Sequence, residues 1–186
     1  MSTVLIVAGI VAVILVLMYN TLIAKKNQVD NIFGGVDAVL KKRFDLIPNL
    51  VASVERYMEH EKSTLEKVTR LRAEAMKPNL SDTQKIALDA KLTAALGSIT
   101  VAMENYPDLK ANENVMHLQH SLHEIEEQIS AARRAYNQAV TDYNNAIEMF
   151  PTNLMAGWMS LGRKAVFEIP QNERQNVDVG NLFKQS

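Results

Sequence analysis

The chain has 186 residues, enough for one domain and a membrane anchor but hardly for two domains. Twenty basic residues against 21 acidic ones give a net charge of −1, and aromatic residues are few, so no nucleic-acid partner is expected. The lack of cysteine excludes disulfides, thiolate metal sites and cysteine nucleophiles.

The first two dozen residues predict a membrane-spanning helix. Residues 4–19 read VLIVAGIVAVILVLMY, and the first charged side chain is Lys25. As a helix, the uncharged stretch extends roughly 36 Å, enough to cross a hydrocarbon core of about 30 Å. A cleaved signal peptide would have a basic residue before the apolar run and small residues before the cut, and this sequence fits neither requirement well. We therefore expect an uncleaved anchor at residues 1–24.

The charges around this span predict its orientation. No basic side chain precedes the apolar run, whereas Lys25 and Lys26 follow it directly. Because basic residues tend to stay on the cytoplasmic side, we expect a short external N-terminus and a cytoplasmic body.

Beyond the anchor, apolar residues recur at alternating steps of three and four, which is typical of an amphipathic helix with a coiled-coil-like seam. The seam predicts one helix that ends near Met76. Pro48 lies inside it and would remove one backbone hydrogen bond and clash with the carbonyl of Phe44, at a cost of about 3 kcal/mol. The phase is unchanged across Pro48, so we expect a bend, with a break as the open alternative. The seam residues are Val29, Phe33, Val36, Leu40, Phe44, Ile47, Val51, Val54, Met58, Leu65 and Val68.

Two further long helices follow. SDTQ at 81–84 matches a capping box, and an apolar stripe continues from it to Met103. NYPDLKAN at 105–112 predicts a turn, and Asn112 is the expected N-cap of a third helix that Pro151 ends. Because helices of this length cannot bury their seams alone, we expect an all-α fold, an up-and-down antiparallel bundle of long helices over residues 25–167.

The C-terminal part is less patterned. Residues 152–169 carry the only tryptophan, Trp158. This segment is expected to form a short fourth helix on the bundle, or else to lie on the membrane with Trp158 at the interface or to bind another subunit. Residues 168–186 are predicted to be a polar tail.

Few residues suggest chemistry. His117, His120 and Glu124 are candidate metal ligands on one helix, but steps of three residues rotate His117 and His123 about 120° apart, which favours an ordinary solvated face. No phosphate-binding loop, zinc-protease helix or serine nucleophile elbow is present in the sequence. We expect no enzyme and no cofactor.

Polar residues beside the third seam are better candidates for structural contacts. Glu126 and Arg133 share a heptad position, as do Asn137 and Asn144. Such residues can fix the register between packed helices, although a solvated flank is an equal alternative for each of them.

Several motifs together resemble the LemA family over residues 19–167. The resemblance implies a bacterial inner-membrane protein with one N-terminal span, a short external N-terminus and a cytoplasmic helical domain; similar members include a magnetosome protein that shapes internal membranes. Three departures from the family pattern are Gly34-Gly35, Ala38 and the histidines. The motifs are VDAVLKKRFDLIPNLV (36–51), YMEHE (57–61), YPDLKAN (106–112), LQHSLHEIEEQISAARRAYN (118–137) and VTDYNNAIEMFP (140–151).

Residues in the two most distinctive motifs are carried over as candidate contacts that join helix ends. These are Arg43, Asp45, Asn49, Asp108 and Lys110.

The main functional hypothesis is a membrane-anchored scaffold that forms a homo-oligomer and organises or shapes the bacterial cell membrane. The lipid bilayer is then its first partner. The alternatives are an adaptor for another membrane protein, such as a protease or a transporter, and a metal-dependent activity at the histidine cluster.

Overall fold

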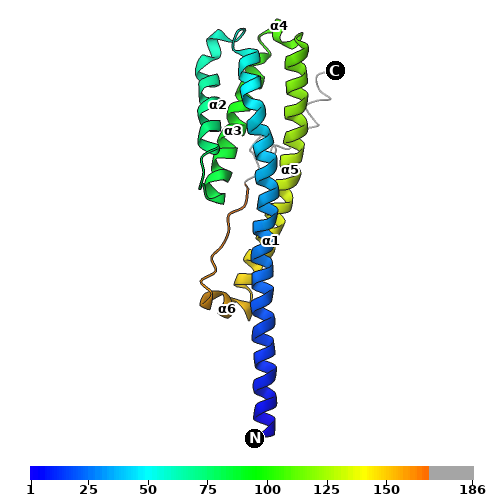
Figure 1. Ribbon diagram of the computed structural model, residues 1–186, viewed down its shortest axis with the longest axis vertical. Helices are drawn as coiled ribbons and strands as arrows, with labels where there is room; N and C mark the ends of the chain where they lie inside the picture. Colours follow the sequence, from blue (N-terminus) through cyan, green and yellow to red (C-terminus); the bar gives the residue numbers. More distant parts are fainter. Residues whose placement is uncertain (168–186) are drawn as a thin grey trace, which may run out of the picture.

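The computed structural model describes residues 1–167, which are helical apart from turns and a C-terminal extended segment (Figure 1). No strand occurs among these residues, and the predicted all-α class is confirmed. The helices of the described part are α1 (Ser2–Val54), α2 (Lys62–Ala75), α3 (Asp82–Met103), α4 (Pro107–Lys110), α5 (Glu113–Glu148) and α6 (Thr152–Trp158), with a 3-10 turn, η1, at Glu59–Glu61.

The long helices run up, down, up and down along one axis (Figure 1). The shorter α2 and α3 pack on each other and cover only the half of the bundle far from the N-terminus, whereas α1 and α5 continue together as an antiparallel pair. The short α6 lies at the lower end of this pair, and the first part of α1 projects beyond it. The first fully buried residue of α1 is Leu22. The protein is therefore a two-helix stalk that carries a four-helix head.

The helix α1 is continuous through both positions where it could have broken. Gly34-Gly35 and Pro48 all lie inside its 53 residues. Proline leaves the carbonyl four residues earlier, that of Phe44, without its helical donor. Arg72 of α2 supplies the missing donor, because its Nε lies 2.7 Å from that carbonyl oxygen. The alternative of a break at Pro48 is thus excluded.

The predicted single helix up to Met76 is wrong, because the chain reverses between α1 and α2. The reversal needs neither glycine nor proline: Tyr57 and Met58 both donate backbone hydrogen bonds to the Val54 carbonyl at 3.0 Å, and Glu61 donates to Met58. The Met58 side chain is fully buried and closes the end of the core. An apolar residue in the turn at a seam position preserves the periodicity, which explains why the pattern did not reveal the turn.

Both predicted N-terminal caps are confirmed. The Ser81 Oγ accepts from the Gln84 amide, and the Gln84 side chain accepts from the Ser81 amide, which completes the capping box of α3. The Asn112 side chain accepts from the amides of Asn114 and Val115 at the start of α5. These bonds satisfy amides that have no partner within the helix.

After α6 the chain turns back along the stalk as an extended segment, residues 161–167, which we call the strap. Two asparagines of α5 bind its backbone. Asn144 donates to the Lys164 carbonyl and accepts from the Lys164 amide, both at 3.0 Å. Asn137 pairs in the same way with Phe167, at 2.9 and 2.8 Å. The predicted polar tail, residues 168–186, lies outside the described residues.

Candidate functional site

A buried cluster of charges lies where α1, α3 and α5 meet. Arg43 of α1 and Asp89 of α3 are each 1% exposed, and Arg133 of α5 is 9% exposed. Glu126 of α5 and Thr93 of α3 complete the cluster at its more exposed edge. Charges this deeply buried are costly unless each has a partner.

The two carboxylates bridge the two guanidinium groups. Asp89 accepts from Arg43 through Oδ1 and from Arg133 through Oδ2, the latter at 2.5 Å. Glu126 accepts from Arg43 at 2.9 Å and lies 3.6 Å from Arg133. Thr93 Oγ1 accepts from Arg43 at 2.9 Å. Two positive and two negative charges leave the cluster neutral.

This arrangement suits a structural role better than a reactive one. Both carboxylates are engaged by arginine, which makes either of them a poor general base. Asp89 and Thr93 are four residues apart on α3, so both face the same neighbours. Because one aspartate binds arginines from two different helices, a slide of α3 by one turn would break both ion pairs. The cluster therefore fixes the register of α1, α3 and α5.

An aromatic chain connects the cluster to the strap and the stalk. The Arg133 guanidinium lies 5.7 Å from the ring centre of Phe167. The Phe167 ring meets Tyr136 edge-on at 5.4 Å, and Tyr136 in turn lies 5.3 Å from Phe33. Burial raises the pKa of Tyr136 to about 12, and the carboxylates of Asp82 and Asp30 act in the same direction. The strap is thus attached beside the charged cluster.

Sequence reasoning found three members of the cluster and missed two. Arg43, Glu126 and Arg133 were candidates for contacts between helices, and the structure brings their side chains together. Asp89 and Thr93 were not predicted, because they lie between the apolar residues of α3 and belong to no recognised motif. The available signal was the position of Asp89 three residues before buried Leu92, which places a carboxylate on the buried face.

The other carried-over candidates lie at the surface. Asp45, Pro48 and Asn49 are exposed on α1, and Asp108 is exposed on α4. Lys110 forms an ion pair with Glu104, which joins the end of α3 to α4.

The remaining candidates lie elsewhere along α5 and α6. Asn137 binds the strap, as described above. Trp158 is 82% exposed on α6.

The three clustered histidines, His117, His120 and His123, lie on a solvent-exposed face of α5. His120 lies 3.6 Å from Glu124, and His123 lies 3.7 Å from Glu127, each as an exposed pair one turn apart. His117 is also exposed. Within residues 1–167, no group of three histidine, aspartate or glutamate side chains is placed to share a metal ion.

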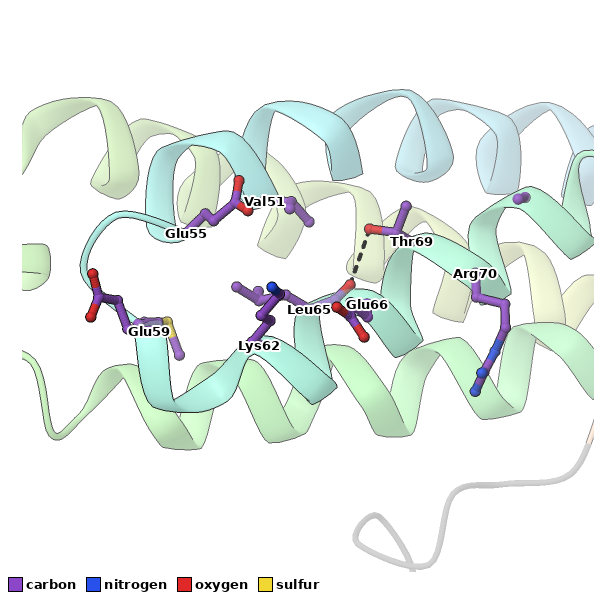
Figure 2. Close-up of a pocket in the computed structure, with 10 residues that line it drawn as sticks. Val51, Glu55, Glu59, Lys62, Leu65, Glu66, Thr69 and Arg70 are labelled. Atoms are coloured by element: carbon purple, nitrogen blue, oxygen red, sulfur yellow. Dashed lines mark hydrogen bonds between the residues drawn. The ribbon is translucent and has the colours of Figure 1, made fainter.

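Among residues 1–167, the grooves on the surface of the head include the following two. Figure 2 shows one of about 710 Å³ at the reversal between α1 and α2, whose lining includes the apolar Val51 and Leu65 and the charged Glu55, Glu59 and Lys62. The other, about 1100 Å³, follows α3 and is lined mainly by its small residues, with Asp89, Arg133 and Phe167 along one side. The second groove therefore borders the charged cluster.

The comparison with known proteins identifies the family of the chain. The family model described as the LemA family matches residues 32–180. The chain belongs to the LemA family. Protein LemA of Metamycoplasma hominis is 28% identical over 163 residues, which cover 88% of this chain and 74% of that LemA protein.

Two other similar proteins match a shorter part of the chain. Magnetosome proteins MamQ 1 and MamQ 2 of Paramagnetospirillum magneticum are each 30% identical over 83 residues. This match covers 45% of the chain but only 30% of either magnetosome protein.

Proposed function

We propose that this LemA-family chain is a membrane-anchored helical scaffold that self-associates and organises or shapes the bacterial cell membrane, without catalysis. The observation that carries the proposal is the continuity of α1, whose 53 residues extend roughly 80 Å at 1.5 Å per residue from an exposed apolar end into the buried core of the head. A helix shared by anchor and head transmits position and tilt directly between them.

The exposed end of α1 supports anchoring. An 18-residue window near the N-terminus has a mean hydropathy of 2.7, and none of it is buried against protein. The helix α3 is also long and apolar enough to cross a membrane, but a third of its window is buried, and it carries Asp89 of the charged cluster. We therefore assign the span to α1 alone, with Lys25 and Lys26 on the cytoplasmic side.

Self-association is supported by the groove along α3. Its lining includes Ala90, Ala94, Gly97 and Val101, small or apolar side chains that allow another helix to approach closely. Two of the similar proteins are named magnetosome proteins, which is consistent with a role in organising membranes.

The absence of native cysteine allows one set of single-cysteine variants to test both parts of the proposal. In intact spheroplasts, a membrane-impermeant maleimide should label Ser2→Cys directly and Ser98→Cys only after lysis. The reverse pattern would contradict the orientation.

The same Ser98→Cys variant tests self-association, because Ser98 lines the α3 groove. In native membranes a short bis-maleimide should join two copies carrying different tags, and the matched control Thr141→Cys, exposed on α5 outside that groove, should give fewer such adducts. Adducts only with other proteins would favour the adaptor instead.

A further inference from the structure

The C-terminal end of α5 lies level with the end of the apolar run of α1. Three contacts define the antiparallel register of the two helices: Phe33 with Tyr136, Lys25 with Asp142, and Arg43 with Glu126. The residue numbers in each pair add up to 167 or 169. When this register is continued to the end of α5, Phe150 falls opposite residues 17–19, where the apolar run of α1 ends.

An apolar face that the other described residues, up to Phe167, leave uncovered begins at this level. Leu154 and Trp158, one turn apart on α6, are 61% and 82% exposed, and Phe150, just before the helix, is 80% exposed. Met149 beside them is 63% exposed. The opposite side of α6 is occupied, because Ala156 is buried in the core. We call these four exposed residues the α6 face.

The α6 face lies beside the apolar surface of the proposed anchor (Figure 1). Residues such as Val4, Leu5 and Leu17 on the projecting part of α1 are 60% to 70% exposed. Figure 1 shows α6 beside the point where that part of α1 emerges from the stalk. Tryptophan and phenylalanine at such a level are typical of the boundary between headgroups and acyl chains.

We propose that the α6 face inserts into the lipid interface and gives the protein a second membrane contact beside its anchor. The inference rests on the anchoring part of the proposed function. Two contact points define a direction as well as a position, so the insertion sets the tilt of the stalk. The Arg163–Glu148 pair, at 2.6 Å, joins the strap to the end of α5 next to this contact and so stabilises the geometry of the bend.

The single tryptophan makes the test direct. The full chain is reconstituted in vesicles of phosphatidylcholine and phosphatidylglycerol, and alkaline-washed vesicles are floated to establish anchoring. Trp158 fluorescence is then measured with lipids brominated near the headgroup or near the end of the acyl chain. We expect blue-shifted emission, stronger quenching by the shallow bromines, and little quenching by aqueous acrylamide.

Two variants serve as controls. Trp158→Phe combined with Met116→Trp moves the reporter to an exposed site near the start of α5, at the far end of the head and outside the α3 groove, where only acrylamide should quench it. Phe150→Ser with Leu154→Ser keeps Trp158 as the reporter and should reduce its quenching by lipid. Both residues are exposed, so helicity by circular dichroism should be unchanged.

The outcomes separate the two proposals. Protein that floats but whose Trp158 is quenched by acrylamide and not by brominated lipid would overturn the second contact and leave the anchor intact. Blue-shifted emission without lipid quenching would also overturn it, because protein then covers the α6 face. Failure to float would overturn the anchor and the second contact together.

Discussion

The Nε of Arg72 on α2 donates a hydrogen bond to the carbonyl of Phe44 on α1, at 2.7 Å. That carbonyl is the one that Pro48 deprives of its helical partner. Arg72→Ala should therefore lower the free energy of unfolding by about 1.5–3 kcal/mol, as expected for a hydrogen bond to a charged donor. Chemical denaturation of the full chain in mild detergent, followed by circular dichroism, measures the loss.

A double-mutant cycle tests the cause of this loss. In a Pro48→Ala background the new amide at position 48 can donate to the Phe44 carbonyl, so Arg72→Ala should cost roughly 1 kcal/mol less. Arg70→Ala, an exposed neighbour on α2, is the matched control. Equal losses in both backgrounds would show that Arg72 stabilises the protein in another way.

The charged cluster should depend strongly on Asp89. Asp89→Ala leaves Arg43 and Arg133 buried without their shared carboxylate, and we expect a loss of about 3–5 kcal/mol. The exposed Asp108→Ala serves as control and should stay within about 0.5 kcal/mol of the parent. A comparable small change for both variants would contradict the proposed fixing of register.

The strap should be released by removal of an asparagine. Seven residues of helix rise about 10.5 Å and three residues of extended chain about 10 Å, so Asn137 and Asn144 match the spacing of Phe167 and Lys164. In Asn144→Ala, the Lys164 amide should exchange its hydrogen much faster, as measured by NMR. The exposed Thr141→Ala should leave that exchange rate unchanged, and equal acceleration in both would argue against the pairing.

High pH should destabilise the protein through Tyr136. Its pKa is about 12 when folded, against an ordinary value of 10.0, so between these pH values the folded chain retains a proton that the unfolded chain has lost. The contribution of Tyr136 is thus fully present below pH 10 and is lost as the pH rises through 12, a total of about 2–3 kcal/mol. Tyr136→Phe should reduce the fall in stability over this window, and an unchanged pH profile would contradict the assignment.

Local sequence patterns predicted much of the fold. Steps of three and four residues identified the buried seams, and short-range capping chemistry identified the starts of α3 and α5, since Ser81–Gln84 and Asn112 act within one turn. The reversal after Val54 was missed because Met58 continues the seam while the backbone turns. A pattern of side chains reports burial and does not report chain direction.

The candidate site was only partly predictable for a similar reason. Arg43, Glu126 and Arg133 were recognisable as polar residues in or near distinctive motifs, but Asp89, the carboxylate that the two arginines share, lies on a different helix. The paired role of Asn137 and Asn144 depends on the strap, whose extended course has no periodic signal. Contacts between distant segments become visible only when the helices are placed in space.

The central claim is self-association of an anchored scaffold, and the mass of the full-length protein in lipid nanodiscs tests it most directly. Mass photometry should give a defined multimer. The mass of a chain lacking residues 1–24, measured in solution, then shows which part of the protein carries the assembly. Persistence of the multimer would place the contact in the head or stalk, and its loss would place it in the anchor. A full-length protein that is strictly monomeric would contradict the scaffold.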